Sequence, residues 1–98
     1  MQKVVSICGS MKFAKDQQKI AEKLELEKGY CVIQCIYGDG KYQYTKQDES
    51  VLDALHKQKI DMSDAIYVVN IGGYVGSSTK SEIEYAKQTG KEIVFHEN

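Results

Sequence analysis

The sequence predicts a small α/β domain of the Rossmann-like or flavodoxin-like type, with a four-stranded parallel sheet (order 2-1-3-4) and helices on both faces. Short apolar runs alternate with amphipathic segments in the order βαβαβαβ, which is typical of parallel strands joined by right-handed crossovers. Two of these runs end in loops of glycine and serine that lead into helices. The 98 residues are enough for one core, so we expect a single domain over residues 1–98.

The N-terminal part begins with a strand over residues 4–8, whose continuous apolar character predicts burial on both faces. Ser10 follows as the N-cap of a helix over residues 12–28. Apolar residues recur at helical spacing along this segment, and charged residues occupy its other side. Gly29 suits the left-handed position that ends such a helix.

The middle of the chain contains a second strand over residues 30–37, rich in β-branched and aromatic side chains. A polar loop over residues 38–45 follows, and its length makes it either a ligand wall or a surface excursion. Tyr37, Tyr42 and Tyr44 are the aromatic side chains that could line a pocket there.

Thr45 opens a second helix that extends to about Ser63. Its expected apolar face carries Leu52, Leu55 and Ile60. The C-terminal part adds a third strand over residues 64–70, a third helix that opens at residue 78 or 79, and a fourth strand over residues 92–95.

The net charge of −1 argues against a basic surface for a nucleic-acid polymer and against a polybasic membrane anchor. No apolar run approaches the roughly 20 residues of a membrane span, and the N-terminus lacks the apolar stretch of a signal peptide. We therefore expect a cytoplasmic protein with no nucleic-acid or membrane partner.

The three cysteines, Cys8, Cys31 and Cys35, fall within the predicted strands and lack the spacing of a zinc motif. We interpret them as small core residues with free thiols, in keeping with a reducing compartment. Neither a dinucleotide fingerprint nor a triphosphate-binding loop is present. The sequence therefore predicts no metal and no cofactor.

The main candidate site is the glycine- and hydroxyl-rich segment between the third strand and the last helix. It places free backbone N–H groups and a positive helix end at the carboxyl edge of the sheet, where open α/β sheets bind ligands. The loop after the first strand repeats this arrangement. The candidate ligand- or phosphate-binding residues are Gly9, Ser10, Met11, Lys12, Gly73, Gly76, Ser77, Ser78 and Thr79.

Glu82 is the candidate nucleophile. Thr79 and Glu82 have the spacing of a capping box, in which the glutamate folds back to the first amide of the helix. A carboxylate at this edge of the sheet can also attack an anomeric carbon and form a glycosyl ester. The structural and the catalytic interpretations are compatible with each other.

His56 and Lys12 each allow two interpretations. His56 lies on or beside the apolar face of the second helix, where it is either a satisfied, half-buried residue or a general acid or phosphate contact. Lys12 is either solvated or adds positive charge to a phosphate held by the first loop.

Two segments of the C-terminal half, Ser63-Asp-Ala-Ile-Tyr-Val-Val-Asn70 and Ser78-Thr-Lys-Ser-Glu82-Ile-Glu-Tyr-Ala86, are similar to the nucleoside 2-deoxyribosyltransferases. The resemblance implies that Glu82 is the nucleophile. The N-terminal Ile7-Cys-Gly-Ser-Met-Lys12 resembles the loop with which the 2'-deoxynucleoside 5'-phosphate N-hydrolases bind the 5'-phosphate end. A small nucleoside or nucleotide is therefore the expected ligand, and cleavage or transfer at its N-glycosidic bond is the expected reaction.

The sequence departs from this family at three positions, one of which is Gly76, where the family has Asp or Ser. Ser6 and His56 stand where the family has a tyrosine and a catalytic aspartate. A non-catalytic nucleotide-binding or sensing module is therefore an alternative, and so is an interaction domain in which Glu82 only caps its helix. Because a four-stranded sheet leaves edges exposed and the pocket open on one side, we also expect a homodimer or a larger homo-oligomer.

Overall fold

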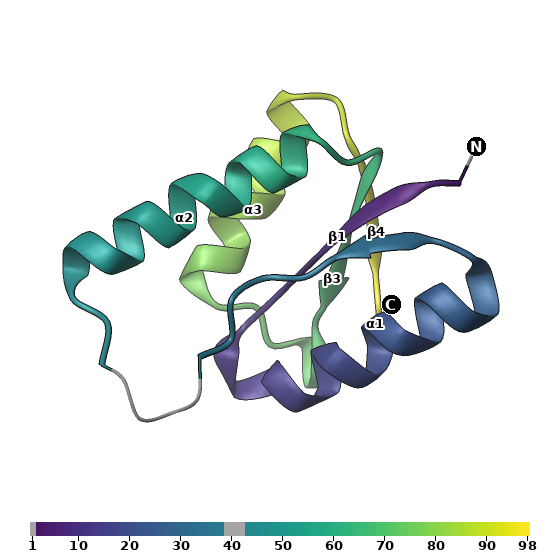
Figure 1. Ribbon diagram of the computed structural model, residues 1–98, viewed down its shortest axis with the longest axis horizontal. Helices are drawn as coiled ribbons and strands as arrows, with labels where there is room; N and C mark the ends of the chain where they lie inside the picture. Colours follow the sequence, from purple (N-terminus) through teal and green to yellow (C-terminus); the bar gives the residue numbers. More distant parts are fainter. Residues whose placement is uncertain (1, 39–42) are drawn as a thin grey trace.

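The computed structural model describes residues 2–38 and 43–98. The predicted α/β fold is confirmed: four parallel strands form one sheet in the order β2-β1-β3-β4 (Figure 1). The strands are β1 (Val4–Gly9), β2 (Cys31–Ile33), β3 (Ala65–Val69) and β4 (Glu92–Phe95). The described part of the chain contains no helix that is long and apolar enough to cross a membrane. Tyr42, a candidate for the pocket wall, lies outside the described residues.

Helices cover both faces of the sheet, as Figure 1 shows. The α-helices are α1 (Ala14–Lys28), α2 (Lys46–Asp61) and α3 (Ser77–Gln88), and the short 3-10 turns η1 (Met11–Phe13) and η2 (Ile71–Gly73) follow β1 and β3. Helix α1 packs on one face, where Ile7, Ala21 and Val69 form a buried cluster. On the other face, which α2 and α3 cover, the buried cluster is Cys8, Ile60, Ile66, Val68 and Ala86.

The predicted ends of two helices are confirmed by their backbone geometry. Gly29 ends α1 in the left-handed conformation, at φ 70°. Thr45 opens α2 with a complete capping box, since its hydroxyl accepts from the N–H of Asp48 and the Asp48 carboxylate accepts from the N–H of Thr45. These local hydrogen bonds fix where both helices start or stop.

The second strand is shorter than the sequence predicted, because only Cys31–Ile33 pairs with β1. Among the described residues, the outer side of this edge strand has no strand partner, and the N–H of Val32 donates to the Glu25 carboxylate at 2.9 Å. After Ile33 the chain leaves the sheet. The prediction that all three cysteines lie in core strands is therefore wrong: Cys8 is buried, Cys31 is exposed and Cys35 lies beyond β2.

The capping-box interpretation of Glu82 is also wrong. Helix α3 starts at Ser77 with Gly76 as its N-cap, so Thr79 is the third helical residue. Glu82 then lies in the second turn, beyond reach of the first amide. The early start has a simple cause: Gly76 has extended backbone angles, and its carbonyl accepts from the N–H of Lys80 at 2.9 Å.

Candidate functional site

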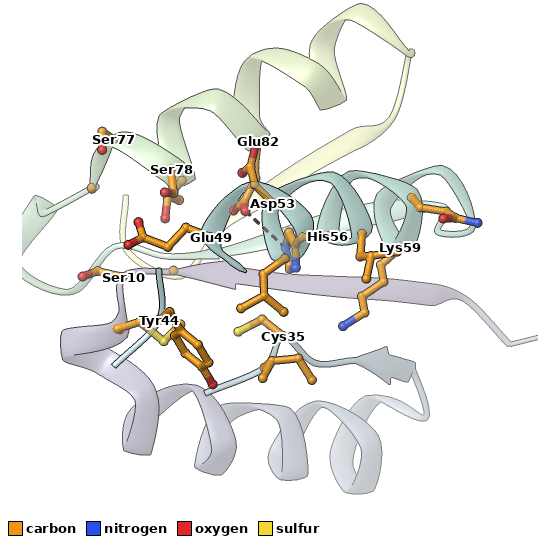
Figure 2. Close-up of a pocket in the computed structure, with 18 of the residues that line it drawn as sticks. Ser10, Cys35, Tyr44, Glu49, Asp53, His56, Lys59, Ser77, Ser78 and Glu82 are labelled. Atoms are coloured by element: carbon orange, nitrogen blue, oxygen red, sulfur yellow. Dashed lines mark ion pairs between the residues drawn. The ribbon is translucent and has the colours of Figure 1, made fainter. Parts of the chain in front are cut away.

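A pocket of about 760 Å³ opens at the carboxyl edge of the sheet, between the loop after β1, the start of α3 and one side of α2 (Figure 2). This volume lies within the roughly 300–1,000 Å³ typical of small-molecule sites. Its walls combine hydroxyls and carboxylates with apolar side chains. The apolar and aromatic part of the lining consists of Met11, Ile36, Tyr44, Leu52, Leu55, Met62 and Tyr74.

Glu82 lies in the wall of this pocket and is only 7% exposed. Burial raises the pKa of its carboxyl to about 7, and the negative charge of Asp53 acts in the same direction. A hydrogen bond from Cys8 and the positive charge of Lys57 oppose this rise. The carboxyl therefore keeps its proton to a much higher pH than an exposed glutamate does.

His56 faces Glu82 from α2, and the dashed line in Figure 2 marks their contact. Its Nε2 lies 3.7 Å from Glu82 Oε2 and 3.3 Å from the sulfur of Cys8. Burial, helped by the positive charge of Lys59 and opposed by Asp53, lowers the pKa of His56 to about 4. His56 is therefore neutral at pH 7. His56 is thus buried and contacts Cys8, and it also lines the pocket.

Cys8 lies beneath these two side chains, near the end of β1, and is 1% exposed. Burial raises the pKa of its thiol well above the usual range, so the sulfur carries its proton in the metal-free protein. That one proton can be donated either to His56 or to Glu82. Within the described part of the chain, the ligand atoms of these three residues lie within 4.8 Å of one another and could hold a metal ion.

The N-terminus of α3 forms one end of the pocket. Ser77, Ser78 and Thr79 occupy its first turn and line the pocket, and Thr79 is 2% exposed. The first turn contains no acidic residue, so nothing in it offsets the positive end of the helix dipole. This end of the pocket is suited to an anionic or hydroxyl-rich group.

The loop after β1 lies at the other side of the pocket from the start of α3, and two hydrogen bonds hold its conformation. The Ser10 hydroxyl accepts from the N–H of Lys12 at 3.3 Å, so Ser10 caps the 3-10 turn η1. The predicted α-helix begins later, at Ala14, with Phe13 as an N-cap that makes no side-chain hydrogen bond. The buried Gln17 donates to the Ser10 carbonyl at 2.8 Å. A Cβ atom at Gly9 would lie 2.9 Å from Gln17 Nε2, so only glycine leaves room for this bond.

The structure brings most of the sequence-predicted site residues into one pocket. Lys12 and Gly73 are the exceptions. The Lys12 ammonium lies over the ring of Tyr74, 4.2 Å from its centroid, and Gly73 closes a turn with the carbonyl of Asn70. The predicted residues that do line the pocket are Gly9, Ser10, Met11, His56, Gly76, Ser77, Ser78, Thr79 and Glu82.

Sequence reasoning missed Asp53, Glu49 and Tyr74, which also line the pocket. Asp53 precedes His56 by one helical turn, so its spacing could have placed it on the same face of α2. Leu55, which was expected on the apolar face of α2, is 47% exposed and lines the pocket. The apolar side of α2 is therefore divided between the core and the pocket, a division that hydrophobic periodicity cannot reveal.

Comparison with known proteins supports the fold but identifies no family or activity. No protein-family model and no curated protein matches the chain. A conserved protein from Enterococcus faecalis V583, known from a crystal structure, is similar to it with a TM-score of 0.67 and 14% identity. The alignment covers 97% of this chain and 63% of that one, so this chain spans less than two thirds of the neighbour's length.

Proposed function

We propose that the pocket binds a small nucleoside or nucleotide and that Glu82 acts at the N-glycosidic bond. The position of Glu82 carries this proposal: its carboxyl lies in the wall of a pocket that begins at the N-terminus of the same helix. Glu82 follows Ser77 by five residues, which corresponds to about 7.5 Å along the helix axis. This separation suits a pentose whose 5'-phosphate end lies at the start of α3.

The rest of the lining supports the same ligand class. A phosphate or sugar hydroxyl at Ser77 and Ser78 would meet free N–H groups and an unopposed helix dipole. The wall at Tyr44 and Leu52 would receive a flat heterocyclic base. The phosphate, the sugar and the base of a nucleotide would thus each contact a different part of the pocket.

In this proposal the ionised Glu82 carboxylate attacks the anomeric carbon while the carbon–nitrogen bond to the base breaks. The electron pair of that bond stays on the base nitrogen, which takes a proton from water. Water or a second base then releases the sugar from the ester. We do not assign the proton donor to His56, because its pKa of about 4 leaves it unprotonated at neutral pH.

One experiment tests the reaction. Purified protein with a metal chelator present is incubated with deoxynucleosides, their 5'-monophosphates and NAD, and free base is measured by chromatography. We expect base release by the wild type and a loss of about a thousandfold or more in Glu82→Gln. Glu84→Gln is the matched control, because Glu84 lies on the same helix but is exposed. Equal rates in the two variants would contradict the proposal.

A non-catalytic nucleotide-binding module is the second candidate, and the surroundings of Glu82 favour it. Cys8 and His56 contact the carboxyl from inside the protein, and its raised pKa favours the protonated form, which cannot attack. For such a module we expect no base release by the wild type. A deoxynucleoside 5'-monophosphate would still raise the melting temperature, and would do so in Glu82→Gln as well.

A further inference from the structure

We propose that Cys8, His56 and Glu82 form a binding site for zinc or a similar thiophilic divalent ion at the floor of the pocket. The three residues come from β1, α2 and α3, and all are buried. Their sulfur, nitrogen and carboxylate ligand atoms lie within 4.8 Å of one another. This inference goes beyond the proposed function and does not depend on it.

The spacing of the ligand atoms suits one tetrahedral ion. Zinc bonds of ~2.3 Å to sulfur and ~2.0–2.2 Å to nitrogen and oxygen place neighbouring ligand atoms of a tetrahedron about 3.4–3.6 Å apart. The sulfur of Cys8 lies 3.3 Å from His56 Nε2, and that nitrogen lies 3.7 Å from Glu82 Oε2. An ion therefore needs side-chain shifts of only a few tenths of an ångström at these two spacings.

The chemistry of the three groups selects the class of ion. Thiolate, imidazole and carboxylate together are typical of zinc ligands, whereas the sulfur disfavours magnesium and calcium. A bound dication would be neutralised by one thiolate and one carboxylate, so no net charge would be buried. Binding requires that the thiol lose its proton to solvent.

The charges around the cluster are compatible with a cation. Lys57 pairs with Asp53 at 3.3 Å, and Lys59 donates to the carbonyl of Gln34 at 3.3 Å. Asp53 also lies close enough to affect both His56 and Glu82 electrostatically. One nearby carboxylate thus offsets part of the positive field of the two lysines.

The site has access to solvent on one side. His56 and Glu82 line the pocket, and Cys8 lies beneath them. Three protein ligands with a fourth position facing a pocket are the arrangement of a zinc ion that can also bind water or a ligand. If Glu82 also acts at a glycosidic bond, the metal would occupy its carboxylate and slow that reaction.

Cobalt(II) is the probe that tests this site, because its spectrum reports both geometry and sulfur ligation. We expect a one-to-one titration of the metal-free wild type, with intense visible bands of a tetrahedral site and a near-ultraviolet sulfur-to-cobalt band that zinc abolishes. Cys8→Ser should lose the near-ultraviolet band. Loss of a residue that only hydrogen-bonds to a metal ligand typically weakens metal binding by roughly 10–100-fold. Glu82→Gln removes a direct ligand, so it should weaken cobalt binding by at least this much. Cys31→Ser, which removes an exposed thiol, should match the wild type.

Two results would overturn the proposal. One is a wild-type spectrum without the sulfur band. The other is a sulfur band that persists in Cys8→Ser, which would place the metal on another thiol. If Cys8→Ser does not fold by circular dichroism, Glu82→Gln and a zinc-dependent rise in wild-type melting temperature decide the question. Failure of base release with the cobalt spectrum intact would reject the glycosidic function alone.

Discussion

Burial acts in opposite directions on the two titratable side chains that meet in the pocket. It lowers the pKa of His56 from 6.5 to about 4 and raises that of Glu82 from 4.5 to about 7. Between pH 4.5 and 6.5 the unfolded chain holds one proton on this pair, on the histidine, and the folded protein also holds one, on the glutamate. The pair therefore adds almost no pH dependence to stability in this range.

Single substitutions should reveal the pH dependence of stability that each of the two residues contributes and that cancels in the wild type. In Glu82→Gln only His56 remains, with a lowered pKa, so the free energy of unfolding should fall as pH decreases from 6.5 towards 4. In His56→Asn only Glu82 remains, with a raised pKa, so stability should fall as pH increases from 4.5 towards 7. Each change should amount to roughly 2–3 kcal/mol.

Urea unfolding over this pH range, with a chelator present, measures both slopes. The wild type is the reference, and its other titrating groups are shared by the two variants. Slopes of the same sign in the two variants, after subtraction of the wild-type curve, would contradict the assigned pKa directions. The pattern of the sequence could not have predicted these shifts, because desolvation depends on which side chains surround each group.

At the scale of single elements, local signals predicted the end of α1 and the start of α2 correctly. Gly29 and the Thr45 capping box act through backbone angles or hydrogen bonds within a few residues, whereas Ser10 caps only the short turn η1 before α1. The start of α3 was misplaced because several serine and threonine residues follow one another there. The extended backbone at Gly76 decided which of them began the helix.

The capping box of α2 gives a direct test at this scale. In Thr45→Ala the N–H of Asp48 loses the hydroxyl that accepts from it at 3.0 Å, so the free energy of unfolding should fall by about 1 kcal/mol. Urea unfolding measures this loss. Ser50→Ala is the control, since Ser50 is an exposed residue inside the same helix and alanine favours helices. An equal loss in both variants would show that the cap contributes nothing.

At the scale of the whole molecule, the sheet has two outer strands. Strand β4 carries Val94 and Phe95, which are 38% and 44% exposed, and its outer side has no strand partner among the described residues. Edge strands of this kind pair readily with another copy. We therefore retain the prediction that the protein forms a homo-oligomer, with β4 at the interface.

Light scattering coupled to size-exclusion chromatography tests this prediction. The wild type should have at least twice the 11.1 kDa mass of the chain, and Phe95→Lys should shift it towards the monomer. Leu26→Lys is the matched control, because Leu26 is also apolar and is 79% exposed on α1. A monomer at all concentrations, or equal effects of the two substitutions, would reject β4 as an interface.

The sequence by itself determined the order of elements, the parallel sheet and the edge of the sheet at which the pocket lies. Apolar runs and loop chemistry are local properties, and a parallel sheet brings the ends of its strands to one edge. Only the tertiary structure decided which titratable side chains meet in that pocket. Cys8, His56 and Glu82 are far apart in the chain and carry no spacing signal, and they meet because β1, α2 and α3 pack together. Their protonation and their fitness for a metal arise from that packing.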